Sequence, residues 1–170
     1  MSTVDPTVAR LWFESVDADS SGLLDAKELR QALDIGGLDY TLAQAHLFVR
    51  TFDSTGNQKL NVNEFVELHL FLETVQSSFS RVARGGRWLS TADVKQALNL
   101  MGHSLSDTAM QAVLSRYDMN RRGNFGVEEF LQMCLFLRTA GRAFQAFDPT
   151  KCGFAQFNFN QFCYAASYLA

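Results

Sequence analysis

Apolar residues recur every three or four positions over most of the chain, which is the period of an amphipathic helix. The first such segment follows Asp5, a suitable N-cap residue, and Pro6, which is favoured in a first helical turn. We therefore expect a helix from about residue 6, with the apolar side chains Val8, Leu11, Trp12 and Phe13. We expect no strands beyond short bridges between loops.

Two further helix starts carry a capping side chain. Thr41 precedes one apolar stripe, and Ser104 or Ser106 precedes another. The two stripes consist of Leu42, Ala45, Phe48, Val49 and Phe52, and of Met110, Val113, Leu114 and Tyr117. We expect the apolar residues that flank the polar loops to form the core.

The polar loop after the first helix, DADSSGLLDAKE, gathers four carboxylates within twelve residues. Like charges this close repel one another unless a cation lies among them. Gly22 at the sixth position suits a sharp turn with positive φ, and Glu28 at the twelfth can fold back to offer two oxygens. The pattern predicts a Ca²⁺ site with an affinity of roughly 0.1–10 μM. Its ligands would be Asp17, Asp19, Ser21, Leu23 (through its carbonyl), Asp25 and Glu28.

Four altered copies of this loop follow along the chain. The five loops begin at residues 17, 53, 82, 118 and 148, so the intervals are 36, 29, 36 and 30 residues. A long interval has room for an exit helix, a turn and a new entry helix, whereas a short one leaves room for a single helix of about 25 Å. Residues 65–81 and 130–147 should therefore each form one helix shared by two loops, which gives eight helices.

The second loop keeps the charged ligands at its two ends and no others. Gln58 replaces glycine at its sixth position, which costs on the order of 1 kcal/mol if the backbone keeps a positive φ. We predict a weak or conditional Ca²⁺ site here. Its ligands would be Asp53, Thr55, Asn57, Lys59 (through its carbonyl), Asn61 and Glu64.

The fourth loop, residues 118–129, keeps the same frame but places Arg122 where a ligand belongs. The guanidinium would either occupy the place of the cation or repel it. We expect this loop to bind no Ca²⁺. The residues that remain in ligand positions are Asp118, Asn120, Asn124 and Glu129.

The third and fifth loops have lost more of the pattern. Val82, Arg84 and Gly86 stand at the first, third and fifth positions of the third loop and offer no side-chain oxygen. A count from the preceding helix starts this loop at Ala83 and makes it one residue short. Its arginines and glycines are compatible with a guanidinium in place of the ion or with a bound anion. In the fifth loop Phe159 replaces the closing glutamate, so we expect that hand to be structural.

Composition narrows the classes of function. The chain has 170 residues, 47% of them hydrophobic, which is too apolar for a disordered protein, and its net charge of −3 leaves no basic footprint for nucleic acid. We find no run of eighteen apolar residues and no signal peptide. Three cysteines without disulfide-like spacing indicate reduced thiols and a cytoplasmic protein. No nucleophile or paired acid and base stands out, so we do not expect an enzyme.

Five helix-loop-helix units at these intervals resemble the penta-EF-hand family. The segments that carry the resemblance are DADSSGLLDAKELRQAL, ADVKQALNLMGHSLSD and FNFNQFCYAASYLA, and it covers nearly the whole chain. It implies an all-α fold of five EF-hand units, built from eight helices in a single domain over residues 1–170. The hands would cover about residues 6–34, 42–73, 66–101, 106–137 and 131–169.

An odd number of hands leaves one hand without a partner. The first should pair with the second and the third with the fourth, through the eighth residue of each loop. The fifth would expose apolar surface, which a two-fold dimer covers economically, and the family forms such dimers. The predicted interface consists of Phe159, Phe162, Tyr164 and Tyr168. The alternative is that these aromatic side chains fold back on their own core.

A calcium-responsive adaptor is the function that these features favour. Capture of the ion by Glu28 would draw the exit helix inward and expose apolar surface for another protein. The resemblance implies a homodimer, calcium-dependent protein or peptide partners such as Pro-rich segments, and recruitment to membranes as peripheral association when calcium rises, without nucleic acid. Two tryptophans that line a peptide pocket in the family correspond to His69 and Val75.

Two other functions remain open at this point. The chain could be the regulatory subunit of a calpain-like cysteine protease, which pairs through its fifth hand with a catalytic chain. It could also be a structural scaffold that holds one permanent Ca²⁺ and does not switch. Co-purification with a cysteine protease would favour the first, and binding of an apolar dye that is equal with calcium and with chelator would favour the second.

Overall fold

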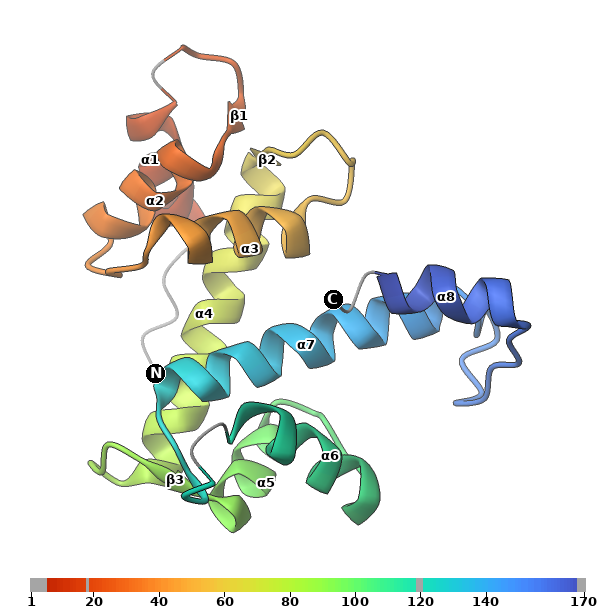
Figure 1. Ribbon diagram of the computed structural model, residues 1–170. Coiled ribbons are helices and arrows are strands. Elements are labelled where there is room, and N and C mark those ends of the chain that lie inside the picture. Colours follow the sequence, from red (N-terminus) through yellow and green to blue (C-terminus); the bar gives the residue numbers. More distant parts are fainter. Residues whose placement is uncertain (1–5, 18, 119–120, 168–170) are drawn as a thin grey trace. The chain divides into compact units, whose positions relative to one another are not determined.

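The computed structural model describes residues 6–17, 19–118 and 121–167. The chain divides into two compact units, with the boundary between Thr74 and Val75. Helices and the loops between them make up almost all of both units (Figure 1). The expected all-α fold is confirmed.

The first unit contains two helix-loop-helix hands (Figure 1). Its helices are α1 (Pro6–Val16), α2 (Ala26–Ile35), α3 (Leu42–Phe52) and most of α4 (Val62–Ala83). Its loops contain the two-residue strands β1 (Leu23–Leu24) and β2 (Leu60–Asn61).

The second unit contains the remaining elements. They are the end of α4, then β3 (Leu89–Ser90), α5 (Thr91–Leu100), α6 (Asp107–Tyr117), β4 (Asn124–Phe125), α7 (Val127–Gln145) and α8 (Phe159–Ser167). The described residues thus form the eight expected helices. The helices α4 and α7 are uninterrupted, as the short loop intervals predict, and α7 ends two residues before the predicted boundary.

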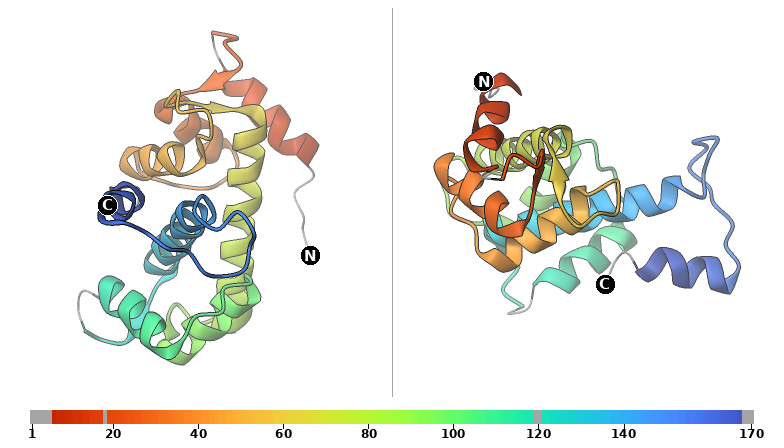
Figure 2. Two further views of the ribbon diagram at one scale, coloured as in Figure 1. Left: turned by 90° about the vertical axis from the view of Figure 1, so that its right-hand side faces the viewer. Right: turned by 90° about the horizontal axis from the view of Figure 1, so that it is seen from above.

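The loops pair as predicted, through their eighth residues. In the first unit Leu24 lies opposite Leu60 in an antiparallel bridge, and Figure 2 shows the two loops side by side in both views. In the second unit Leu89 lies opposite Phe125. The first hand is therefore paired with the second and the third with the fourth.

Helix caps follow the sequence signals where these lie in the described residues. Thr41 caps α3, because its side chain accepts from the Gln44 backbone N–H and the Gln44 side chain accepts from the Thr41 N–H. Of the two candidate serines before α6, Ser106 is the cap. The predicted cap at Asp5 lies outside the described residues.

Buried apolar side chains follow the predicted stripes, with one exception. In α3 the residues Ala45, Phe48, Val49 and Phe52 are buried as expected. In α1 the buried residues are Ala9, Phe13 and Val16, so Val8 and Leu11 are exposed and their assignment to the core was wrong. The physical reason is that the spacing of four and three residues through Phe13 runs through the small Ala9 rather than through its larger neighbours.

Two further expectations concern thiols and membranes. Cys134, Cys152 and Cys163 form no disulfide, and Cys134 is buried within α7. Of the helices in the described ranges, none combines the length and the apolar character that crossing a membrane requires.

Candidate metal centre

The backbone of the first loop folds around the carboxylate of Asp17. Ser20 and Gly22, at the fourth and sixth positions, have φ angles of +53° and +72°, and the second of these turns the chain sharply without strain because it is a glycine. The turn places the Ser21 N–H 2.9 Å from Asp17 Oδ1 and the Gly22 N–H 2.8 Å from Asp17 Oδ2. Asp17 is therefore fixed on the inner side of the turn.

Four of the six predicted ligands already lie together in this loop. Ser21 Oγ lies 3.3 Å from Asp17 Oδ1 and 3.0 Å from the carbonyl oxygen of Leu23. The Ser21 N–H also donates to Asp19 Oδ1 at 3.0 Å, so Asp19 shares a donor with Asp17. The oxygens at the first, third, fifth and seventh positions are thus gathered, and only the ligands at the ninth and twelfth positions lie apart from them.

The other two ligands, Asp25 and Glu28, cap the start of α2. Asp25 Oδ1 accepts from the Lys27 and Glu28 N–H groups, and Glu28 Oε2 accepts from the Asp25 N–H at 3.0 Å. Glu28 Oε1 accepts no hydrogen bond from any described residue. Among the residues that the structure describes, no three His, Cys, Asp or Glu side chains form a metal-binding cluster. Glu28 therefore has to turn toward Asp17 for the loop to surround an ion.

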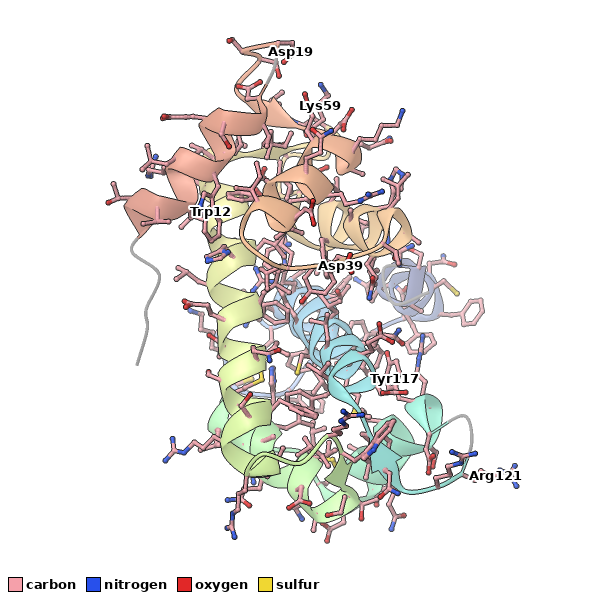
Figure 3. The ribbon with its side chains drawn as sticks, turned by 90° about the vertical axis from the view of Figure 1, so that its left-hand side faces the viewer. Trp12, Asp19, Asp39, Lys59, Tyr117 and Arg121 are labelled. Carbon is pink, nitrogen blue, oxygen red and sulfur yellow. The ribbon has the colours of Figure 1, made fainter. Side chains whose placement is uncertain are left out.

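Hydrogen bonds lower the pKa values of two carboxyl groups of this loop, those of Asp19 and Asp25. The hydroxyl and the N–H of Ser21 lower the pKa of Asp19, and the N–H of Glu28 is the largest cause of the lowered pKa of Asp25. Lys59 in the second loop lowers both pKa values further, and Figure 3 shows Asp19 and Lys59 in the neighbouring loops. Ionised, hard oxygen donors in this arrangement fit Ca²⁺.

The second loop has the same backbone frame with the glycine displaced. Gly56 and Gln58, at the fourth and sixth positions, have φ angles of +76° and +61°, so Gln58 keeps the positive φ that we expected. The Gln58 N–H donates to Asp53 Oδ2 at 2.7 Å, and the Thr55 hydroxyl donates to Asp53 Oδ1 at 3.0 Å. The first and third ligands therefore lie together here as well.

The closing glutamate of the second loop is held differently from that of the first. Glu64 Oε1 accepts from both the N–H and the hydroxyl of Ser54, at 2.8 and 2.6 Å. Glu64 Oε2 accepts from the Asn61 N–H at 2.9 Å, and the residue is only 4% exposed. Both oxygens are thus engaged by the protein, whereas Glu28 has one oxygen without a described donor.

Two neutral ligands of the second loop also accept hydrogen bonds from backbone N–H groups close to them in the chain. Asn57 Oδ1 accepts from the Lys59 N–H at 2.9 Å, and Asn61 Oδ1 accepts from the N–H groups of Asn63 and Glu64. These bonds support the loop and the first turn of α4. They leave the second loop with fewer available oxygens than the first.

The fourth loop keeps the turn around its first ligand. Asp118 accepts from the N–H groups of Arg122 and Gly123, both at 2.9 Å. The Arg122 side chain is exposed and forms no ion pair in the described part of the chain. Glu129 caps α7 by accepting from the Gly126 N–H, and Asn124 lies in β4. Asn120 lies outside the described residues.

The fifth loop retains the turn despite the loss of its glutamate. The N–H groups of Cys152 and Gly153 donate to the two carboxylate oxygens of Asp148, at 3.0 and 2.7 Å. Lys151 and Gly153 have φ angles of +54° and +78°. Phe159, at the twelfth position, is 78% exposed.

The third loop begins inside the helix that precedes it. The helix α4 continues to Ala83, so Val82, at the first position of the loop, lies inside the helix and is buried. Arg84, at the third position, has no side-chain oxygen. Asp93, at the twelfth position, caps α5 together with Ser90. Arg84 lowers the pKa of Asp93, after the hydrogen bonds from Ser90, but forms no ion pair with it in the described residues.

Two features escape the ligand pattern. The left-handed backbone at the fourth position recurs at Ser20, Gly56, Arg121 and Lys151, and of these only the glycine gives a sequence signal. Ser54 occupies no ligand position, so nothing in the pattern marks its bonds to Glu64. His69 and Val75, which correspond to pocket tryptophans in the family, are both buried.

Comparisons with known proteins agree with this geometry. A family model described as an EF-hand domain pair matches residues 7–69. Peflin from Danio rerio is 31% identical over 160 residues, which are 91% of this chain and 58% of that protein, so the chain spans little more than half of that relative. Sorcin from Schistosoma japonicum is 32% identical over 165 residues, which are 96% of each protein.

A solved structure shares the fold over nearly the whole length. It is that of a homologue of programmed cell death 6 protein from Leishmania major Friedlin, with 26% identity and a TM-score of 0.64. The match covers 95% of this chain and 94% of that one. The chain belongs to the penta-EF-hand family of calcium-binding proteins.

Proposed function

We propose that the protein is a calcium-responsive adaptor whose first loop is its principal Ca²⁺ site. The observation that carries this proposal is the contrast between the two closing glutamates. Glu28 closes a loop in which the oxygens at the first, third, fifth and seventh positions lie together, and it has one carboxylate oxygen without a described donor. Glu64 has both oxygens engaged by Ser54 and Asn61.

Movement of Glu28 would be transmitted through α2. Glu28 lies in the first turn of this helix, whose other face buries Leu29, Ala32 and Leu33. At the far end of α2, a Cβ at Gly36 would lie 2.7 Å from the ring of Trp12, so the indole packs directly on that end. A shift of α2 therefore changes the surroundings of Trp12 and the apolar contacts between α1 and α2.

The fifth hand supports a dimer as part of this proposal. Phe159, Phe162 and Tyr164 are 78%, 59% and 59% exposed, and α8 has no buried residue. This exposure favours the dimer over the alternative, in which these side chains fold back on their own core. Tyr168, the fourth predicted interface residue, lies outside the described residues. An apolar aromatic surface of this kind favours pairing with the same surface of a second copy.

The partners and the location follow from the same proposal. A calcium-exposed apolar surface would take protein or peptide segments, Pro-rich ones among them, and would recruit the protein from the cytoplasm to membranes when calcium rises. The chain acts by binding rather than by catalysis. The protease-subunit alternative has no specific support among the described contacts, and the scaffold alternative is favoured only by the engagement of Glu64.

Substitution of Glu28 tests this function. Glu28→Gln should weaken calcium binding at least tenfold, because the closing carboxylate is lost, while the helical content stays unchanged. Titration calorimetry measures the affinity. Trp12 fluorescence, read in a Trp88→Phe background, measures the shift of α2 and should no longer respond to calcium.

The matched control is Glu14→Gln, which removes the same charge from an exposed position of α1. It should bind calcium like the unmodified protein. Wild-type affinity of Glu28→Gln would contradict the assignment of the site. Normal calcium binding with no change in Trp12 fluorescence would support the scaffold instead.

A further inference from the structure

The degenerate third loop borders a cavity that the calcium response does not use. The cavity has a volume of about 370 Å³ and lies wholly within the second unit. Its lining residues come from the end of α4, from the third loop and from the start of α7, and are Gln76, Phe79, Ser80, Gly85, Gly86, Arg87 and Val127. Figure 1 shows the start of α7 beside the later part of α4.

The loop that forms one wall has a defined shape. Arg84 and Gly85 have φ angles of +50° and +86°, and the Gly86 N–H donates to the Ala83 carbonyl at 2.7 Å. A Cβ at Gly86 would lie 2.9 Å from that carbonyl oxygen, so no larger residue fits there without a shift of the backbone. The loop is therefore held in a defined conformation, and Gly85, Gly86 and Arg87 of this loop line the cavity.

The surface around the cavity is positively charged. The segment 81–87, RVARGGR, carries three arginines and no acidic residue, and all three side chains are exposed. Arg87, which lines the cavity, forms no ion pair with any described residue. Arg84 contributes to the lowered pKa of Asp93 without forming an ion pair with it in the described residues, and Glu128 beside Val127 is exposed. The guanidinium groups of the loop are therefore available to carboxylates of a partner.

Apolar side chains complete the surface. Phe79 and Val127 line the cavity, and Trp88, directly after Arg87, is 60% exposed with its ring 3.2 Å from a Cβ placed at Gly126. Arginine and tryptophan are the residue types that contribute most to protein interfaces. A volume near 370 Å³ is at the lower end for a binding pocket, which suits one or two side chains rather than a whole cofactor.

From these features we infer that the third hand is a calcium-independent docking site for an acidic peptide segment of another protein. A bulky apolar side chain of that segment would enter the cavity, and flanking Asp or Glu residues would pair with Arg84 and Arg87. Charge complementarity identifies the occupant, because arginine binds carboxylates through paired hydrogen bonds. This site does not depend on the proposed calcium response, since the third loop offers no ligand for the ion.

Selection from a library of random twelve-residue peptides displayed on phage tests the inference. The immobilised full chain is used, in chelator and again in calcium. We expect the selected peptides to combine acidic residues with a large apolar residue in both conditions. A selected peptide, labelled with fluorescein, should then bind at least tenfold more weakly to Arg84→Glu/Arg87→Glu and more weakly as salt rises.

Two further variants separate the cavity from the charge. Ser80→Trp changes an exposed helix position so that the new ring fills the cavity, and it should also weaken the peptide at least tenfold. Arg30→Glu makes the same charge change on the exposed face of α2 and should leave the affinity unchanged. Circular dichroism and calcium titration of each variant check that it folds and that the first loop still works.

The inference is overturned by any of the following results. The first is no enrichment of peptides over empty resin, and the second is enrichment without acidic residues or with equal binding to the charge-reversed variant. The third is arginine-dependent binding to vesicles of phosphatidylserine without peptide binding, which would assign the surface to a membrane. Selection that succeeds only in calcium would also contradict it. Failure of Glu28→Gln to affect calcium binding would not bear on it.

Discussion

At the scale of single residues, the second position of a calcium loop offers no ligand, yet in the second hand it determines how the closing glutamate is held. Ser54 donates twice to Glu64 Oε1, and Glu64 is buried by these and the neighbouring contacts. The corresponding residue of the first loop is Ala18, which has no hydroxyl to offer. The Ser54 hydroxyl is therefore one difference between the two loops, beside the lower charge of the second loop and its Gln58.

Removal of this hydroxyl should strengthen the second site. In Ser54→Ala the backbone bond remains and the bond at 2.6 Å is lost, so Glu64 is released more easily toward an ion. A hydrogen bond to a charged group contributes about 1.5–3 kcal/mol, which corresponds to a gain in affinity of roughly tenfold or more. Calorimetry in a Glu28→Gln background, where the first loop is silent, measures the change.

The conservative variant Ser54→Thr keeps a hydroxyl and should leave the second loop as weak as before. If Ser54→Ala also shows no added binding, the low charge of the second loop and not the bond to Glu64 limits its affinity. That result would contradict the role given to Ser54.

The ligands of the first loop could be predicted from sequence because each is set by residue type at a fixed position. The state of Glu64 could not be, because it depends on a partner ten residues earlier and on burial. The exposed Arg122 shows the same limit, since charge at a ligand position predicts repulsion but not where the guanidinium points.

At the scale of elements, α1 and α4 meet at a pair of rings in the first unit. Trp12 packs edge-on against His69, with ring centroids 4.9 Å apart, and Figure 3 shows Trp12 directed toward α4. His69 is 3% exposed, and neither ring nitrogen has a described hydrogen-bond partner. Burial lowers the pKa of His69, and Glu73 one turn away opposes this only in part.

Stability should therefore fall as the pH falls through the range of an ordinary histidine. The folded state holds His69 neutral with a lowered pKa, while the unfolded state takes up a proton below about pH 6.5. The contribution of neutral His69 to the free energy of unfolding is fully present above about pH 6.5. It is lost as the pH falls toward the lowered pKa of the folded state. Thermal unfolding measured from pH 8 to pH 5 should show this loss.

His69→Phe should remove this part of the pH dependence and stabilise the protein by about 1 kcal/mol at neutral pH. Phenylalanine keeps the ring contact with Trp12 and leaves no buried nitrogen without a partner. His103, whose pKa burial also lowers, stays in the variant and should supply the remaining slope. An unchanged pH profile would show that His69 is hydrated in solution.

The elements themselves follow from short-range signals, which explains why they could be predicted. Loop intervals determine that α4 and α7 are continuous, and side-chain caps at Thr41 and Ser106 determine where two helices begin. Only packing decides which apolar residue of a helix is buried. For this reason Leu11 could not be assigned correctly from its hydropathy.

At the scale of the whole molecule, the exposed fifth hand is the surface through which we propose that the protein dimerises. Figure 2 shows α8 at the end of an extended connection after α7, and its aromatic side chains are exposed. Phe162→Asp should convert the proposed dimer to a monomer, because a carboxylate would be buried in an apolar interface. Sedimentation equilibrium at micromolar concentration measures the mass, with Leu11→Asp as a control at another exposed apolar position. A monomeric unmodified protein would contradict the dimer.

The left-handed turn persists in the fifth loop, where no glutamate could complete a cage. Its shape comes from backbone amides that surround Asp148, and the same amides shape the first loop around Asp17. We therefore expect the architecture to survive in a resting cell, where free calcium is scarce. Calcium would then act as a signal on a protein that is already folded, and the protein would not require the ion in order to fold.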